Sequence, residues 1–360
     1  MNSKATQSIL ALATASLKSG QNPATRSSIY PRVDYIELQQ IIDMDVLNYS
    51  IYEQNRFGGL LRRVETNIRS DLYLTLIGLL HKRSHRLVFT MSERAGIPFA
   101  FLQQYFPGRK PLVSMFTSWS WRQEKAITSF NLFSAMDLII VKCQAMQQNF
   151  LSLKAPPERI RVIPFGIDHH FFSPIKDVEQ LNNFVMTTGE IRTRDYATLF
   201  KAVAELPIKI FAAATGSWYA REKHTSLEMP VPDNVILSHR LSPAELRTAY
   251  AQSSFVVVPL YDAPHSAGAT TVLEAMSMGR AVIVSRSSGI LDYVIDGQTG
   301  ILVSPGNVEE MREVIAHLIS HPEEARRLGQ NARRRIEAEL NIDVYVKQIA
   351  DTLKEYISRL

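Results

Sequence analysis

The sequence predicts an α/β protein of two domains, each with a mostly parallel sheet covered by helices on both faces. Short apolar runs alternate with segments of helical period along the chain, which is the pattern of strands joined by crossover helices. A polar stretch, residues 175–183, interrupts this alternation, which then restarts. The length of 360 residues also corresponds to about two domains.

The first half of the chain contains apolar runs that predict buried strands. The expected strands are Ser8–Thr14, Leu87–Thr90, Leu112–Phe116, Asp137–Lys142 and Ile160–Pro164. The expected helices are Val33–Ile41, 57–83, Ala95–Gln103, Arg122–Ala135 and Cys143–Lys154. The first of these helices follows a proline, which is a common residue at a helix entry.

Residues 57–83 combine a helical apolar period with an excess of basic residues. The apolar positions are Leu60, Leu61, Val64, Ile68, Leu72, Leu76, Leu79 and Leu80. The basic residues in and just after the segment are Arg62, Arg63, Arg69, Lys82, Arg83 and Arg86. One interpretation is a helix that packs on the core and leaves its basic residues in water. The other is a surface helix that meets anionic lipid or an anionic acceptor.

The second half repeats the alternation of strands and helices. The expected strands are Phe184–Thr188, Ile208–Ala214, Asn234–Ser238, Phe255–Leu260 and Ala281–Val284. Ser242 and Glu245 form the capping box of a helix over Pro243–Gln252. Helices are expected over most of the tail from Val308, with a break at residues 340–343.

A loop of small residues, 263–271, joins the strand ending at Leu260 to the next helix. Gly268 lets the backbone approach a ligand closely, and residues 266–273 include no charged side chain. Because the N–H groups and the positive dipole end of a helix attract anions, this loop predicts a phosphate site. The alternative is that Thr271 and Glu274 form a capping box, in which Glu274 only satisfies amides at the helix start.

Composition indicates a soluble globular protein, with 46% apolar and 21% charged residues. No apolar run is long enough to span a bilayer, and the short run after Lys4 is interpreted as a strand rather than a signal peptide. Cys143 is the only cysteine, which excludes an intrachain disulfide and favours a cytoplasmic location. Residues 1–180 carry 21 Lys and Arg against 14 Asp and Glu, whereas residues 181–360 carry 19 against 21. The basic first half is therefore expected to face something acidic, such as an anionic acceptor or the inner membrane surface.

The sequence contains no P-loop, no Gly-x-Gly-x-x-Gly and no Gly-x-Ser-x-Gly motif. His81 and His85 are one helical turn apart but lie among basic residues, and the pair His169–His170 has no further ligand nearby in sequence. We therefore expect no metal and no other cofactor, and no nucleic-acid partner.

Residues 158–174 and the segment from Leu273 to Val303 are two stretches that resemble motifs of GT-B glycosyltransferases of family four, which are retaining enzymes that take a sugar from a nucleotide diphosphate. Residues 158–174, ERIRVIPFGIDHHFFSP, resemble the hinge of these enzymes, with Phe165 in place of an asparagine. The run LEAM-x-x-G-x-A-V-I from Leu273, followed by G-x-x-D-x-V-x-D-G-x-T-G-x-L-V up to Val303, resembles their donor site.

The resemblance implies a GT-B fold of two doubly wound, Rossmann-like domains that face each other across a cleft. It implies an acceptor-side domain over residues 1–174 and a domain that binds a nucleotide diphosphate sugar over residues 175–340. The last helix, residues 341–360, is expected to pack back on the first domain.

The resemblance also implies roles for individual residues of the second domain. Arg194, with Arg192 as a less regularly spaced partner, matches the basic pair that clamps the diphosphate, and Gly268, Thr270 and Thr271 match the amides beside it. Glu274 matches the second glutamate of the Glu–seven residues–Glu motif, which binds the ribose. Arg240 and Leu241 align with the loop that holds the base.

The sequence departs from the family pattern at two positions. The first glutamate of the motif falls on Ser266, beside which His265 is a candidate donor group. Phe116 stands where relatives often place a histidine near the reacting sugar carbon. Glu93, at the end of a first-domain strand, is the remaining carboxylate to test as a catalytic residue.

The function that the resemblance implies is metal-independent, retaining transfer of a sugar to an acceptor hydroxyl of a glycan, lipid or small molecule. Two alternatives stay open: a non-catalytic homologue that binds nucleotide, and an enzyme that hydrolyses or epimerises the nucleotide sugar. The sequence identifies neither the donor sugar, the base, the acceptor nor the oligomeric state.

Overall fold

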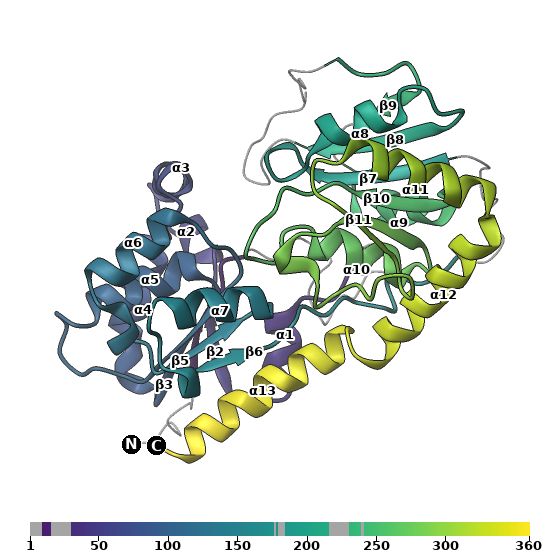
Figure 1. Ribbon diagram of the computed structural model, residues 1–360. Helices are drawn as coiled ribbons and strands as arrows, with labels where there is room; N and C mark the ends of the chain where they lie inside the picture. The colour runs from purple at the N-terminus through teal and green to yellow at the C-terminus, as the bar shows by residue number, and fades with distance from the viewer. Residues whose placement is uncertain (1–8, 16–29, 176–177, 179–183, 216–229, 239–240) are drawn as a thin grey trace. The chain divides into compact units, whose positions relative to one another are not determined.

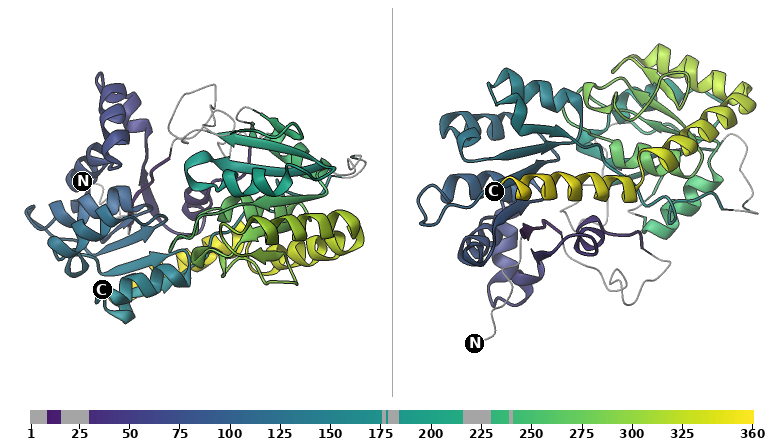
Figure 2. Two further views of the ribbon diagram at one scale, coloured as in Figure 1. Left: turned by 45° about the horizontal axis from the view of Figure 1, so that its top comes forward. Right: turned by 90° about the horizontal axis from the view of Figure 1, so that it is seen from below.

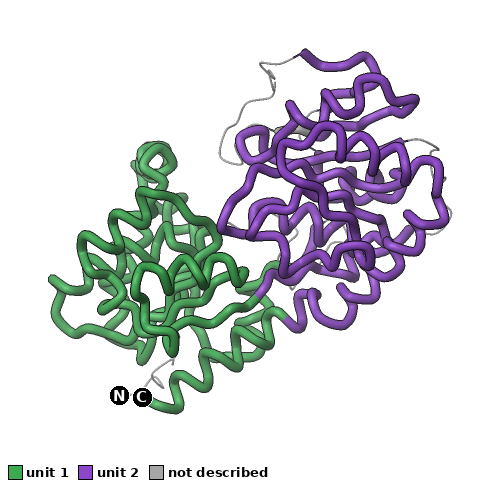
Figure 3. The backbone as a smooth tube through the Cα atoms, in the orientation of Figure 1, with its two compact units in different colours: residues 1–26, 32–163, 345–360 green, residues 27–31, 164–344 purple. Residues whose placement is uncertain are grey.

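The computed structural model describes residues 9–15, 30–175, 178, 184–215, 230–238 and 241–360. They form two compact units, shown in Figure 3. Unit 1 comprises the described parts of residues 1–26, 32–163 and 345–360, and unit 2 comprises those of 27–31 and 164–344. The predicted domain limits at 174 and 341 stay predictions.

Unit 1 is built on a parallel sheet of six strands in the order β2-β1-β3-β4-β5-β6 (Figure 1). The strands are β1 (Ile9–Leu12), β2 (Met44–Leu47), β3 (Leu87–Thr90), β4 (Leu112–Phe116), β5 (Leu138–Val141) and β6 (Ile160–Val162). All residues of β1, β3, β4 and β5 are buried, as the continuous apolar runs predicted.

The helices of unit 1 lie between successive strands, except the last one, which follows unit 2 in sequence. They are α1 (Asp34–Gln39), α2 (Ser50–Glu53), α3 (Gly58–Ile68), α4 (Leu72–His81), α5 (Glu93–Leu102), α6 (Trp121–Ser129), α7 (Gln144–Ser152) and α13 (Ile342–Ser358), whose residues from Tyr345 belong to this unit. The expected single helix over residues 57–83 is wrong. Arg69 takes a left-handed conformation (φ 54°) that ends α3, and α4 begins after Asp71.

Unit 2 has a second parallel sheet of six strands, in the order β12-β11-β10-β7-β8-β9. The strands are β7 (Phe184–Glu190), β8 (Lys209–Thr215), β9 (Val235–Leu237), β10 (Phe255–Val258), β11 (Ala281–Ser285) and β12 (Ile301–Val303). The helices are α8 (Tyr196–Val203), α9 (Pro243–Gln252), α10 (Ala269–Ser277), α11 (Val308–Ser320) and α12 (Pro322–Ala338).

Helices cover both faces of this sheet (Figure 1, Figure 2). The strand residues Val185, Val257 and Ile283 pack in one core cluster with residues of α8 and α11. Because side chains alternate along a strand, the intervening residues point to the opposite face, where α9 contacts β7 and α10 contacts β10 and β11. The strand order is that of a Rossmann-type doubly wound sheet, which confirms the predicted fold class.

Candidate functional site

The strand order of unit 2 reverses between β7 and β10, which are neighbours in the sheet. From β7 the chain runs to β8 and β9 on one side, and from β10 to β11 and β12 on the other. Such a switch point leaves a crevice at the carboxyl ends of the two central strands, and ligands of doubly wound sheets bind there. The loops after these two strands contain most of the predicted donor-site residues.

The two loops are joined directly to each other. Arg194 and Leu260 form an antiparallel bridge, and the Asp195 N–H donates to the Pro259 carbonyl at 3.1 Å. Asp195 also caps α8, since its carboxylate accepts from the N–H of Thr198. The predicted phosphate-binding loops therefore have a fixed relative position within unit 2.

Helix α10 begins at Ala269, three residues before the start expected from its apolar period. Its N-cap is Gly268, in a left-handed conformation (φ 84°) and without a side-chain cap, so the alternative capping box of Thr271 and Glu274 is wrong. The Ala269 N–H donates to the Ser266 carbonyl at 3.1 Å. The N–H groups of Thr270 and Thr271 lie in the first turn, where a helix offers its amides no intrahelical acceptor. The start of α10 thus has the features of an anion site.

Arg194 is buried and holds the end of β7 against the start of α10. Its guanidinium donates to the Thr188 carbonyl (3.1 Å) and to the Thr271 hydroxyl (3.1 Å). Burial lowers the pKa of Arg194. The group lies so close to Gly189 (φ 137°) that a Cβ there would be 2.5 Å from it, which explains the glycine at the end of this strand. The other predicted clamp residue, Arg192, is exposed in the 3₁₀ turn before Arg194.

Glu274 lies in the second turn of α10 and accepts a hydrogen bond from the Tyr250 hydroxyl at 2.9 Å. Desolvation raises the pKa of the Glu274 carboxyl to about 7, although the bond from Tyr250 and the charge of Arg194 act to lower it. Tyr250 is fully buried, and desolvation raises its pKa well above the usual value. A carboxyl that titrates near neutrality at the switch point is a recognised mark of functional sites.

The loop before α10 is held by two serines, one at the end of β11 and one just after it. The Leu260 N–H donates to Ser285 Oγ (2.9 Å), and the Ala263 N–H donates to Ser287 Oγ (3.0 Å). Further along this loop, Ser266 is buried and its hydroxyl has no hydrogen-bond partner among the described residues. His265 is half-buried beside it. A rigid loop that presents an unsatisfied hydroxyl is suited to bind a polar ligand group.

The remaining predicted residues have different surroundings. Leu241 is half-buried just before α9, whereas Arg240 lies outside the described residues. In unit 1, Glu93 is buried at the start of α5, and its carboxylate accepts from the Thr117 N–H (2.9 Å) and the Ser118 hydroxyl (2.6 Å). Both oxygens of Glu93 thus bind the loop after β4. Phe116 is fully buried among aromatic rings.

The sequence interpretation missed Tyr250 and the two serines that hold the loop before α10. A tyrosine inside a helix of ordinary composition carries no local signal, because only the tertiary fold brings it to Glu274. It also missed the proximity of Asp343 to His169 and His170, whose ligand atoms lie within 4.8 Å of one another in unit 2. Among the described residues this is the one group of histidine, cysteine and carboxylate side chains compatible with a metal ion.

Comparison with known proteins shows similarity to glycosyltransferases. Residues 174–335 match the family model described as glycosyl transferases group 1. The chain is 26% identical over 233 residues to an MMP alpha-(1->4)-mannosyltransferase of Mycolicibacterium hassiacum, covering 63% of this chain and 54% of that protein. It is 26% identical over 234 residues to the sulfoquinovosyl transferase SQD2 of Arabidopsis thaliana, covering 61% and 45%. The chain thus spans about half the length of these curated relatives.

Solved structures show the same fold. HepE of Anabaena, in complex with UDP-glucose, superposes with a TM-score of 0.70 at 18% identity over 97% of this chain and 99% of that one. Sucrose-phosphate synthase from Thermosynechococcus elongatus gives a TM-score of 0.67 at 20% identity, over 80% and 79%. None of the helices in the described part of the chain has the length and apolarity needed to cross a bilayer.

Proposed function

We propose that this chain, whose residues 174–335 match the family model of the group 1 glycosyl transferases, transfers a sugar from a nucleotide diphosphate sugar to an acceptor hydroxyl. The observation that carries the proposal is the start of α10, where amides without intrahelical acceptors lie one turn before Glu274 at the switch point of unit 2. The similarity to a structure that contains UDP-glucose supports this class of donor.

The diphosphate of the donor binds at the start of α10 in this proposal. The amides of Thr270 and Thr271 contact its oxygens, and Arg192 supplies an exposed cation. Arg194 acts mainly by fixing Thr271, to which it donates. Negative charge develops on the leaving diphosphate, and amides with cations stabilise such charge without a metal ion. We therefore propose that no metal is required.

Glu274 binds the ribose. Its carboxylate already accepts from Tyr250 and has lone pairs left for the two ribose hydroxyls. Leu241, just before α9, is the described residue proposed to lie near the base.

The transfer is proposed to retain the configuration of the sugar. The bond from the anomeric carbon to the diphosphate oxygen breaks, and the acceptor oxygen forms its bond on the same face. The acceptor proton passes to the leaving diphosphate oxygen, so no protein base is needed. Because the acceptor attacks on the same face, no protein nucleophile is needed either. This fits the site, because Ser266 stands in the place of the first motif glutamate and a buried Phe116 in that of the histidine.

The same two departures favour a second candidate, a homologue that binds the nucleotide and does not turn over. Ser266 provides a neutral hydroxyl where relatives have a carboxylate, and Phe116 is a buried ring where they often have a histidine. In addition, Glu93 has both oxygens bound within unit 1. If this candidate is correct, nucleotide diphosphates bind to the protein, but no added acceptor causes release of the nucleotide from the nucleotide sugar.

A thermal-shift screen of uridine, guanosine and adenosine diphosphate sugars, with and without a chelator, tests the proposal. We expect one donor to raise the melting temperature equally in both conditions, and that donor to release nucleotide only when an acceptor pool is added. Release without acceptor would indicate hydrolysis, and binding without release would indicate the non-catalytic homologue. The absence of binding by every nucleotide would overturn the proposal.

A further inference from the structure

Helices α3 and α4 of unit 1 expose a row of large apolar side chains that the proposed function does not use. Phe57, Leu60 and Leu80 are 63%, 62% and 69% exposed. The other members of the row, all at least 40% exposed, are Val64, Ile68, Leu72 and Leu76. The spacing of three or four residues places them on one face of α3 and one face of α4. We call this row the apolar face.

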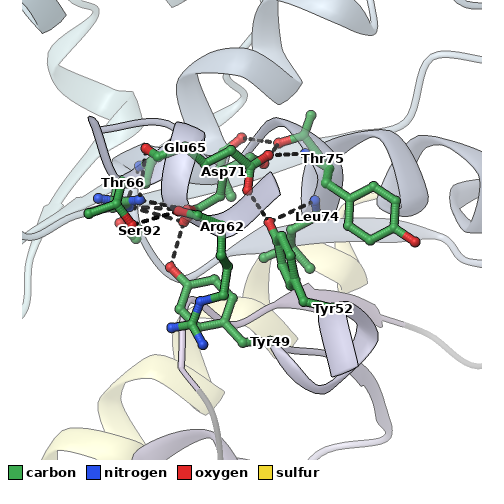
Figure 4. A network of polar contacts seen from close by, with 12 residues as sticks. Tyr49, Tyr52, Arg62, Glu65, Thr66, Asp71, Leu74, Thr75 and Ser92 are labelled. Carbon is green, nitrogen blue, oxygen red and sulfur yellow. Dashed lines mark hydrogen bonds and ion pairs between the residues drawn. The ribbon is translucent and has the colours of Figure 1, made fainter. Parts of the chain in front are cut away.

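Helix α3 turns its acidic residue inward and its apolar residues outward. Its only buried residues are Gly58 and Glu65. The Glu65 carboxylate accepts from the Tyr52 hydroxyl (2.6 Å) and from the Tyr73 N–H (2.6 Å), as Figure 4 shows in part. This arrangement is the reverse of an ordinary surface helix, in which the apolar face is buried and the charges are in water.

Asp71, between the two helices, is also buried. It accepts from the Tyr49 hydroxyl (2.9 Å) and pairs with Arg94 at 2.8 Å (Figure 4). These buried polar contacts fix both helices to the body of unit 1. The apolar face is therefore held outward by satisfied hydrogen bonds rather than by loose packing.

The exposed charges of residues 54–86 are all positive, whereas Glu53, at the end of α2, is an exposed carboxylate just before them. Between residues 54 and 86 the only carboxylates are Glu65 and Asp71, and both are buried. The exposed cations of the same stretch are Arg56, Arg62, Arg63, Arg69, Arg83 and Arg86. An apolar row with six flanking arginines, against the one exposed carboxylate of Glu53, complements an anionic surface that has an apolar interior.

We propose that the apolar face and its arginines dock this protein on an anionic lipid surface. The aliphatic side chains enter the boundary of the headgroups, and the arginines contact the phosphates. A second copy of the chain is a poorer occupant, because a two-fold contact would bring the two sets of six arginines together with only Glu53 of residues 53–86 as an exposed carboxylate to offset them. The inference does not depend on the proposed function, since it concerns unit 1 and requires no turnover.

Flotation of the full chain with lipid vesicles tests the inference. We expect binding to phosphatidylcholine vesicles that contain phosphatidylglycerol, no binding to phosphatidylcholine alone, and loss of binding at high salt. The test variant combines Leu60→Gln, Val64→Gln and Ile68→Gln, because glutamine is a good helix former at exposed positions. Its matched control combines Leu291→Gln and Ile295→Gln, two similarly exposed apolar residues of unit 2.

We expect the triple variant to bind at least tenfold more weakly and the control to bind as the unchanged protein does. A second variant, Arg62→Gln with Arg63→Gln, should lose roughly fivefold per arginine. Its control combines Arg326→Gln and Arg334→Gln on the exposed side of α12.

Three outcomes would overturn the inference. The first is no binding to anionic vesicles, and the second is equal binding by the test and control variants. The third is a concentration-dependent dimer that the triple variant abolishes, which would make the apolar face an interface between copies. Circular dichroism of each variant excludes a loss of folding as the cause.

Discussion

At the scale of single residues, Glu274 shows what a motif conveys and what it leaves out. The motif predicted a carboxylate beside the donor ribose, and the structure places that carboxylate at the switch point. The raised pKa could not be read from the sequence, because it comes from desolvation in the folded protein. Tyr250, the hydrogen-bond donor, comes from another helix.

Replacement of Glu274 by glutamine should weaken nucleotide binding and stabilise the empty protein at neutral pH. The folded pKa of about 7 lies above the ordinary value of 4.5, so the folded state binds the extra proton and loses stability as pH rises through this interval. Glutamine removes that loss. Ribose hydroxyls donate to the carboxylate, so binding by the unchanged protein should strengthen as pH rises through about 7 and level off about one unit above this pKa.

Calorimetric titration with the nucleotide identified by the screen, between about pH 5.5 and 8, measures both effects. The diphosphate itself titrates near pH 6. The informative quantity is therefore the change of the dissociation constant with pH that the unchanged protein shows and Glu274→Gln lacks. We expect a binding loss of roughly tenfold or more at pH 7.5, as for a hydrogen bond to a charged group. A variant with unchanged affinity would exclude Glu274 from the ribose site.

At the scale of elements, the helical period of residues 57–83 predicted helix and missed both its break and its orientation. The period continues from α3 into α4, because apolar residues remain three or four positions apart across Arg69. The spacing of apolar residues also does not show whether that face of a helix packs on the core or is exposed. For α3 the core-facing interpretation is wrong, because buried contacts of Glu65 decided the orientation.

A buried lysine that directly follows β5, Lys142, contacts α13 within unit 1. Lys142 Nζ donates to the Tyr345 hydroxyl at 2.6 Å, and burial lowers the pKa of Lys142 to about 7 despite the nearby charge of Asp34. An unfolded lysine titrates near 10.4, so the unfolded chain binds more protons between about pH 7 and 10. In this interval Lys142 should make unit 1 more stable as pH rises.

The variant Lys142→Met should lack this gain, and Lys347→Met, at an exposed position of α13, should keep it. Thermal unfolding of the three proteins by circular dichroism at pH 7, 8, 9 and 10 provides the measurement. We expect the melting temperature of the unchanged protein to rise relative to that of Lys142→Met over this series. If the melting temperatures of both variants changed with pH in the same way, Lys142 would have the same protonation in the folded and the unfolded chain.

At the scale of the whole molecule, the alternation of strands and helices predicted parallel sheets. Two strands of one sheet that are joined by a crossover helix run in the same direction. Strands β2 and β12 were missed. β2 begins Met44–Asp45 and is only partly buried, so it lacks the continuous apolar run of its neighbours, and β12 has three residues. Strand order was also not readable from one sequence, because it depends on which side each crossover takes. Without that order the switch point, and with it the grouping of Arg194, Thr271 and Glu274, could not be located.

The division into two units leads to a last prediction, on which amides a nucleotide protects from hydrogen exchange. The donor-site residues that the structure brings together all belong to unit 2, and the first-turn amides of α10 have no intrahelical acceptor in the empty protein. A bound diphosphate supplies that acceptor and stabilises the folded form of the unit that binds it.

We therefore expect a nucleotide diphosphate without sugar, at about 100 times its dissociation constant, to slow exchange in β7, β10 and the start of α10 by up to roughly a hundredfold. The strands β1 and β3 of unit 1 should exchange as before. The measurement is exchange followed by peptide mass spectrometry, with Glu274→Gln at the same nucleotide concentration as the control. Equal slowing in both units would show that unit 1 also contributes to nucleotide binding, and slowing confined to unit 1 would place the nucleotide away from the switch point.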